Sequence, residues 1–136
     1  DLHSFPTRRS SDLNLSGVPG LSDNIRVRSI LGRFLEHSRI YAFCNDGDTD
    51  LYIGSADLMH RNLDRRVEAL VRITDPEMIE RLTWLVTHAA SDAVTSWWLE
   101  PDGSWVRHVT GPDGERLEDI QTTLMARARA RVKSRD

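Results

Sequence analysis

Two apolar runs on either side of an Asp-Gly turn constrain the fold of this 136-residue chain more than any other feature. Residues 38–44 (SRIYAFC) and 50–56 (DLYIGSA) are rich in β-branched and aromatic side chains, which favour strands. Between them, Asp46 and Gly47 tolerate the positive φ angles of a tight turn. The sequence therefore predicts a β-hairpin here. Residues 65–73 (RRVEALVRI) alternate imperfectly and are predicted as a third strand.

Three other segments have the spacing of amphipathic helices. Residues 23–36 place apolar side chains close to the 3.6-residue period, with Ser22 as the expected N-cap. A second helix is predicted to begin at Asp75-Pro76 and to end near residue 91, because Asp caps helices and Pro suits their first turn. The third is predicted over about 116–132. Its expected inward side chains are Leu117, Ile120, Leu124, Met125, Ala128 and Val132.

A second hairpin is predicted at residues 95–109 (TSWWLEPDGSWVRHV), turning about Pro101-Asp102-Gly103. Its tryptophans Trp97, Trp98 and Trp105 are interpreted as packing residues rather than as a base-stacking platform. Strands and helices in this order indicate an α/β domain.

The first thirteen residues (DLHSFPTRRSSDL) have no apolar period and join abruptly to the patterned chain. Residues 3–13 resemble the translation of a common sequencing adapter. We therefore expect residues 1–13 to be a disordered, non-native segment, and 14–136 to be a domain truncated on its N-terminal side.

Composition narrows the possible functions. With 39% hydrophobic residues, the chain can bury the core of one domain, and it contains no apolar run long enough to span a bilayer. Cys44 is a lone cysteine in an apolar run, which indicates a buried thiol in a reducing compartment. The net charge of -3 gives no general attraction to nucleic acid, so any anion site must be local.

His37 is the strongest candidate for a chemical role. Alternate residues of a strand share a face, so His37 should point the same way as Arg39, and Ser55 the same way as Asp57. An imidazole, a guanidinium and a hydroxyl in a Gly-Ser turn are groups that phosphoryl transfer uses. Spacing alone leaves the alternative of an ordinary surface histidine open.

Longer motifs carry a family resemblance. His37-x-Arg39, GSAD at 54–57 and then Glu68 resemble half of the phospholipase D signature, H-x-K, G-S-x-N and E. GVPGLSDNIRVRSILGRFLEHSRIYAF and IGSADLMHRNLDRRVEAL closely resemble the C-terminal catalytic domain of polyphosphate kinases of the histidine-phosphorylating type. The resemblance continues through DPEMIERL, SWWLEPDGSWVR and IQTTLMARARAR. The chain departs from the family pattern at Leu58, His60 and Arg72.

The resemblance implies a phospholipase-D-like α/β domain, with a mixed sheet flanked by helices and its N-terminal part missing. It implies the reversible transfer of the terminal phosphoryl group of ATP to polyphosphate through a phosphohistidine on a preceding domain. His37 matches the second family histidine, which would line the ATP site and assist the leaving oxygen. The resemblance also implies Mg²⁺ bound by residues outside this chain, a cytoplasmic enzyme, and a homo-oligomer that binds ATP, ADP and polyphosphate but no nucleic acid.

Other residues take candidate roles from the same resemblance. Candidate phosphate or polyphosphate contacts are Arg39, Ser55, Arg61, Asn62 and Arg65. Glu68 is a candidate orienting acid, and a solvated structural network remains the alternative for the Arg61–Glu68 stretch. Structural or surface positions are expected for His60, His88 and His108, none of which has the spacing of a metal ligand.

Two other functions remain open at this point. A phospholipase-D-like phosphodiesterase is disfavoured, because Arg39 and Asp57 replace the lysine and asparagine of that signature. A non-catalytic fragment that only binds polyphosphate is the second alternative.

Overall fold

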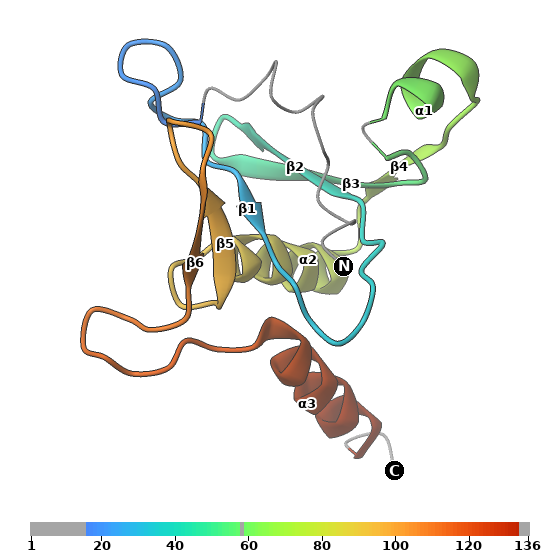
Figure 1. Ribbon diagram of the computed structural model, residues 1–136. Helices are drawn as coiled ribbons and strands as arrows, with labels where there is room; N and C mark the ends of the chain where they lie inside the picture. The colour runs from blue at the N-terminus through green and yellow to red at the C-terminus, as the bar shows by residue number, and fades with distance from the viewer. Residues whose placement is uncertain (1–15, 58, 134–136) are drawn as a thin grey trace. The chain divides into compact units, whose positions relative to one another are not determined.

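The structure is a computed structural model that describes residues 16–57 and 59–133. Its strands form two three-stranded sheets (Figure 1). The elements in chain order are β1 (Arg28–Ser29), β2 (Ile40–Asn45), β3 (Asp48–Gly54), α1 (His60–Arg65), β4 (Leu70–Ile73), α2 (Pro76–Ala89), β5 (Ser96–Leu99), β6 (Trp105–His108) and α3 (Ile120–Lys133). The α/β class is confirmed.

The chain divides into two compact units. Phe34–Ser91 form one, which we call the central unit. The described residues before 34 and after 91 form the other, which we call the flanking unit. Each unit contains one of the two sheets.

The central unit is built on the predicted hairpin. β2 pairs antiparallel with β3, from Ile40 opposite Ile53 to Asn45 opposite Asp48. Asp46 and Gly47 form the loop, with φ angles of 50° and 93°. Two consecutive positive φ angles match the right-handed twist of the strands, which is why an Asp-Gly pair stands there. The prediction of this hairpin is confirmed.

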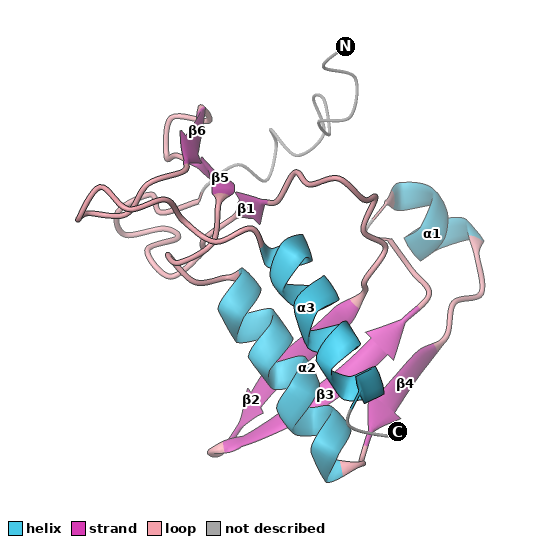
Figure 2. Ribbon diagram, turned by 90° about the horizontal axis from the view of Figure 1, so that it is seen from below, coloured by secondary structure: helices cyan, strands magenta, loops and turns pink. Residues whose placement is uncertain are grey.

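α2 covers one face of this sheet, where it packs on β2 and β3 (Figure 2). Asp75 caps the helix by accepting a hydrogen bond from the Met78 amide at 2.9 Å, and Pro76 occupies the first turn. Leu51, in the middle of β3, is 0% exposed and forms the buried core of the unit. The second predicted helix is confirmed, ending at Ala89.

The third predicted strand, over residues 65–73, is only partly correct. β4 spans Leu70–Ile73 and pairs with β3, whereas residue 65 ends helix α1. Within α1, His60 Nε2 lies 2.8 Å from Asp64 Oδ2, the i,i+4 spacing of helix side-chain pairs. Val67 is fully exposed, and residues 66–69 lie in neither a helix nor a strand.

In the flanking unit, β5 and β6 form the second predicted hairpin. Ser96 lies opposite His108 and Leu99 opposite Trp105. The turn closes through Gly103, whose φ of 84° and whose amide hydrogen bond to the Glu100 carbonyl fit the predicted Pro-Asp-Gly turn. β1 pairs with the other edge of β5. The prediction of the second hairpin is confirmed.

The predicted helix over 23–36 is wrong. Residues 28 and 29 form β1, which pairs with Trp98 and Trp97 of β5, and the Leu99 amide donates to the Val27 carbonyl at 3.0 Å. This pairing binds the backbone to a segment about 70 residues away, which a local period does not reveal. Ser22 instead accepts a hydrogen bond from the Val18 amide within a turn.

α3 begins later than predicted, at Ile120 rather than near residue 116. Asp119 caps it by accepting from the Thr122 amide at 3.0 Å. The preceding amide, of Glu118, donates to the Ala93 carbonyl, which holds that residue outside the helix. Ile120 is buried, as expected. Ala128 and Val132 are exposed, so their expected inward orientation is wrong.

Cys44 lies on β2, as expected, but its side chain is exposed rather than buried. β2 is an edge strand of its sheet, and its exposed residues are those toward the Asp46-Gly47 turn. The expectation of a buried thiol is therefore wrong.

Candidate functional site

The candidate residues of the central unit lie close together because the start of β2, the end of β3 and the start of β4 meet at one end of the sheet. Arg39 precedes β2, Gly54 ends β3, and Ala69 precedes β4. The Gly54 amide donates to the Arg39 carbonyl at 2.9 Å, and the Ser55 amide donates to the Ala69 carbonyl at 3.0 Å. The sheet hydrogen bonds thus extend one step beyond the strands and bring these segments side by side.

Gly54 makes this close approach possible. A Cβ atom at this position would lie 3.0 Å from the Tyr41 ring and 3.2 Å from Leu70 Cδ1. The Tyr41 hydroxyl donates to the Ala56 carbonyl at 3.2 Å, which holds the chain after Ser55 against β2. A larger residue in place of Gly54 would push this turn away from the strand.

Arg39 and Asp57 form the central ion pair of the site. Arg39 Nε donates to Asp57 Oδ1 at 2.7 Å. This hydrogen bond lowers the pKa of Asp57 from its ordinary value, and the charges of Arg39, His37 and Arg61 lower it further. The same bond raises the pKa of Arg39, and the charge of Glu68 adds to that effect. Both side chains are therefore charged, and the guanidinium keeps further N–H donors beyond the one used here.

Ser55 and Glu68 form a second polar pair beside the first. Ser55 Oγ donates to Glu68 Oε2 at 2.5 Å and accepts from the Ala69 amide at 3.0 Å. Glu68 was a candidate for orienting His37. In the structure its carboxylate binds Ser55, so it fixes the hydroxyl of the Gly-Ser turn.

His37 lies in the loop before β2, outside the strand that was expected to contain it, and its side chain is exposed. It is close enough to Asp57 for its charge to lower the pKa of that carboxylate. No hydrogen bond or ion pair joins the imidazole to any residue that the structure describes. An exposed imidazole beside a fixed ion pair can donate or accept a proton, or bind an added ligand.

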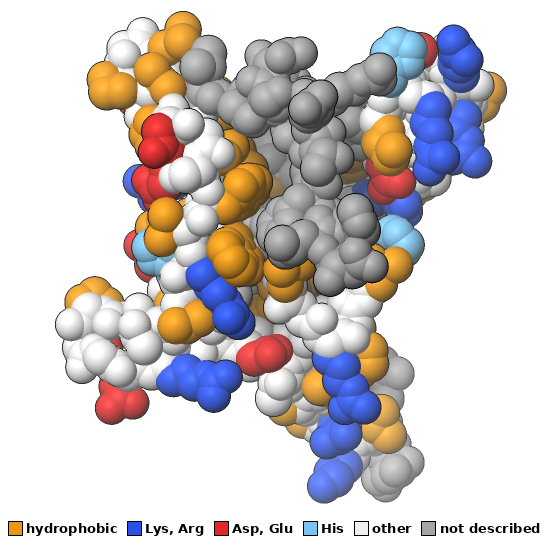
Figure 3. All heavy atoms as spheres, viewed as in Figure 1, with side chains coloured by type: hydrophobic (Ala, Val, Ile, Leu, Met, Phe, Trp, Pro, Cys, Tyr) orange, Lys and Arg blue, Asp and Glu red, His pale blue; other side chains and the backbone are white. Residues whose placement is uncertain are grey.

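The candidates on α1 have two different environments. Asn62 is 2% exposed and accepts a hydrogen bond from Arg61 Nε at 3.3 Å, so its side chain is withdrawn from solvent. Arg61 and Arg65 are exposed. Lys and Arg side chains gather over α1 in the space-filling view (Figure 3). α1 therefore presents a basic surface, to which Asn62 contributes no exposed amide.

Asp57 is the site residue that sequence reasoning left out of its candidate list. The sequence could have indicated Asp57, because it stands two residues after Ser55 in the GSAD turn and has the charge opposite to that of Arg39. Leu58, one of the departures from the family pattern, lies outside the described residues.

No metal site is evident in the described part of the chain. Residues 16–57 and 59–133 contain no group of three or more His, Cys, Asp or Glu side chains arranged to hold a metal ion. The residues present therefore do not fit a Mg²⁺ centre. Within the same residues, no helix is long and apolar enough to cross a membrane.

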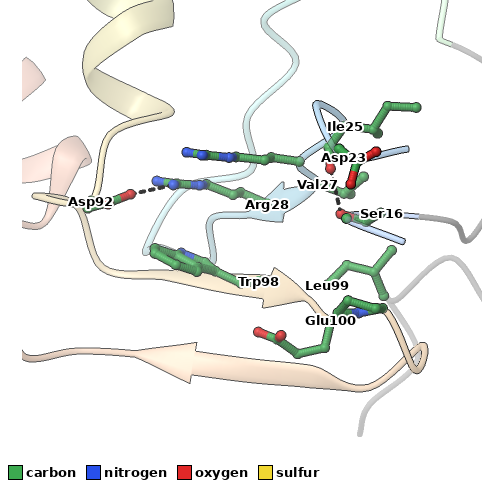
Figure 4. A pocket seen from close by; sticks show the side chains of 12 residues that line it. Ser16, Asp23, Ile25, Val27, Arg28, Asp92, Trp98, Leu99 and Glu100 are labelled. Atoms are coloured by element: carbon green, nitrogen blue, oxygen red, sulfur yellow. Dashed lines mark hydrogen bonds and ion pairs between the residues drawn. The ribbon is translucent and has the colours of Figure 1, made fainter. Parts of the chain in front are cut away.

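The flanking unit contains a separate cavity of about 360 Å³ (Figure 4). The Arg28 guanidinium lies 4.2 Å from the Trp98 ring centroid and forms an ion pair with Asp92. On β5 and β6, the Trp98 and His108 rings stack with their centroids 3.9 Å apart. None of the predicted site residues lines this cavity. Trp98 and His108 have the packing environment expected for them.

Comparison with known proteins gives first the class and then the family. The structure resembles the crystal structure of polyphosphate kinase from Porphyromonas gingivalis, with a TM-score of 0.71 and 26% identity over 83% of this chain and 17% of that chain. The class is thus the phospholipase-D-like α/β domain. A family model described as polyphosphate kinase C-terminal domain 2 matches residues 9–119. The chain belongs to the polyphosphate kinase family.

Curated relatives agree with this assignment. Polyphosphate kinase of Streptomyces coelicolor is 58% identical over 115 residues, and that of Thermosynechococcus vestitus is 51% identical over 115 residues. These matches cover 85% and 82% of this chain but 15% of each relative. The chain therefore spans about one seventh of the length of the curated relatives it matches. The family match begins at residue 9, within the segment predicted to be non-native; that prediction stays untested, since 1–13 lie outside the described residues.

Proposed function

We propose that this chain provides the His37 half of a polyphosphate kinase active site. The whole enzyme transfers the terminal phosphoryl group of ATP to polyphosphate, reversibly, through a phosphohistidine on a preceding domain. The observation that supports this most is the position of His37. An exposed imidazole lies close to the Arg39–Asp57 pair, at the sheet edge that also presents Ser55.

His37 acts on the leaving oxygen in this proposal. When the nucleophilic histidine of the other domain takes the phosphoryl group, ADP leaves with negative charge on its terminal oxygens. His37 donates a proton, or a charged hydrogen bond, to one of these oxygens. In the reverse reaction the imidazole takes back a donated proton. Its exposure leaves it accessible to a group brought by another domain.

Arg39 provides a fixed positive charge for the phosphoryl oxygens. Asp57 holds its Nε edge at 2.7 Å, which orients the guanidinium before the substrate binds. Preoriented donors stabilise developing charge better than mobile ones, because they need no rearrangement during reaction. Ser55, whose hydroxyl is fixed by Glu68 and the Ala69 amide, offers a further polar contact. Arg61 and Arg65 raise the local positive potential for a polyanion.

Further properties of the whole enzyme are part of the same proposal. It acts on ATP, ADP and polyphosphate in the cytoplasm, and it assembles as a homo-oligomer. Mg²⁺ supplies charge neutralisation on phosphoryl oxygens in such reactions. In this proposal residues of the preceding domains bind the ion, and no step assigned to this chain depends on it.

Labelling with radioactive ATP tests the division of the site between domains. A full-length enzyme that contains this chain should form acid-labile phosphate and polyphosphate. The 136-residue chain alone should form neither, because transfer needs the nucleophile and His37 held together. Acid-labile label on His37 with turnover by the chain alone would overturn the proposal. Polyphosphate binding without turnover by the full-length enzyme would favour the non-catalytic alternative.

A further inference from the structure

The second half of α3 is a strongly basic surface that the proposed function does not use. Residues 126–133 are all exposed. Four of these eight residues are cationic, and α3 as a whole contains no Asp or Glu. The cations are Arg127, Arg129, Arg131 and Lys133, which we call the basic half of α3. Figure 3 shows Lys and Arg side chains gathered along this helix.

Helix geometry divides these cations into two rows. At 3.6 residues per turn, Arg127 and Arg131 lie on one side and Arg129 and Lys133 lie nearly opposite. Like charges spaced i,i+4 destabilise a helix. Neither Arg129 nor Lys133 forms a hydrogen bond or an ion pair with any residue that the structure describes. This row therefore holds two neighbouring cations that no described carboxylate neutralises.

Stabilisation of the helix end explains only part of this arrangement. Cations favour the last turn of a helix because of its dipole, and that effect covers Arg131 and Lys133. Arg127 and Arg129 come earlier, where the effect has fallen away. An anionic ligand that bridges a row would remove the repulsion within it.

The residues between the cations limit which ligand fits. They are alanines and Val132, and Val132 is 66% exposed. Such a helix has no broad apolar face to insert into a bilayer. Residues 126–133 also contain no aromatic ring to stack on bases and no amide or carboxylate side chain to read base edges. These features favour a linear polyanion that carries no bases.

We propose that the basic half of α3 binds inorganic polyphosphate, in addition to the residues around His37. This inference rests on the proposed function, since it assigns the same substrate a second contact. Arg129 and Lys133 are about 6 Å apart along the helix axis, so one row follows a short stretch of the polymer. The contact adds affinity for long chains and takes no part in the chemical step.

A pair of matched variants tests the assignment in the 136-residue chain. Binding of fluorescent long-chain polyphosphate is measured by anisotropy at several salt concentrations. R129Q/K133Q removes one row while keeping helix propensity, because Gln is a helix former like Arg and Lys. R26Q/R81Q removes the same charge from exposed positions elsewhere. Circular dichroism verifies that each variant keeps its helix content.

We expect R129Q/K133Q to weaken binding at least fivefold and R26Q/R81Q to weaken it less than twofold. The salt dependence should also fall in the first variant, by roughly 0.7 in logarithmic slope per cation lost, as for single-stranded polyanions. Equal losses in both variants would overturn the proposal, because net charge alone would then explain binding. Equally tight binding of single-stranded RNA or anionic vesicles, or no binding of polyphosphate, would also overturn it.

Turnover separates this inference from the proposed function. In a full-length enzyme, R129Q/K133Q should keep its turnover number at saturating polyphosphate and show a raised KM for long chains only. An equal loss of turnover on short and long chains would contradict a contact that contributes to binding alone. Lack of turnover in the unmodified enzyme would defeat the proposed function, but it would leave the binding result for α3 unchanged.

Discussion

Replacing Leu51 with alanine should remove the main stabilising contact of the central unit. Leu51 is 0% exposed, lies in the middle strand of its sheet, and is flanked by Ala42 on β2 and Ile73 on β4. The change deletes three carbon atoms. At about 0.8 kcal/mol per buried methylene, the lost transfer free energy is about 2.4 kcal/mol. The cavity left behind adds about 1 kcal/mol or more, so the expected loss is about 3–4 kcal/mol.

Urea unfolding followed by circular dichroism and tryptophan fluorescence measures this loss. Ile53→Ala is the matched control, because Ile53 lies two residues along the same strand face but is 42% exposed. Its loss should be about 1–2 kcal/mol, since less of its side chain leaves water. If Leu51→Ala prevents folding, Leu51→Val should still show a loss of about 1 kcal/mol. A loss at Leu51 no larger than that at Ile53 would refute the assignment of Leu51 as the core of this unit.

Three further predictions concern the Asp57 ion pair, residues 1–13 and the cap of α2. The pKa of folded Asp57 is lowered, so its ion pair with Arg39 stabilises the fold above the unfolded carboxyl pKa of about 3.9, and that contribution disappears as pH falls through the folded value. Asp57→Asn should therefore lower Tm at pH 7 and lower it much less at pH 2–3; equal shifts at both pH values would contradict the pair. Deleting residues 1–13 should change the unfolding free energy by less than about 0.5 kcal/mol, and a clearly larger loss would show that the segment belongs to the fold. Asp75→Ala, which removes the cap of α2, should cost about 1 kcal/mol in urea unfolding, whereas an unchanged midpoint would show that the cap is dispensable.

Local signals explain which elements could be predicted from the sequence. The turn at Asp46-Gly47 and the cap at Asp75 each specify structure within a few residues, and both elements were predicted correctly. The helix predicted over 23–36 failed because β1 is fixed by β5, a partner far along the chain. The strand predicted over 65–73 was shortened at its start because residue 65 still belongs to α1 and only residues 70–73 pair with β3.

The candidate site shows the same limit. The Asp-Gly turn determines the register of the hairpin, and that register brings the backbone of Arg39 beside Gly54, the residue before Ser55. Contacts that cross to β4 were not predictable in this way. Glu68 reaches Ser55 from the segment before β4, and Asn62 is buried although its neighbours Arg61 and Arg65 on α1 are exposed. Neither follows from the spacing of residues along the chain.

The central claim is that His37 acts on the transferred phosphoryl group, and its replacement in a full-length enzyme tests this most directly. His37→Ala should lower the turnover number by about a hundredfold to ten-thousandfold, the range for a positioned acid or base, with a smaller change in ATP affinity. His37→Gln, which keeps a hydrogen-bond donor but cannot carry a proton, should restore binding more than rate. His88→Ala is the control, because His88 stacks on Trp84 within α2, and it should remain near wild type. Near-normal turnover of His37→Ala, with activity lost instead in His88→Ala, would contradict the account.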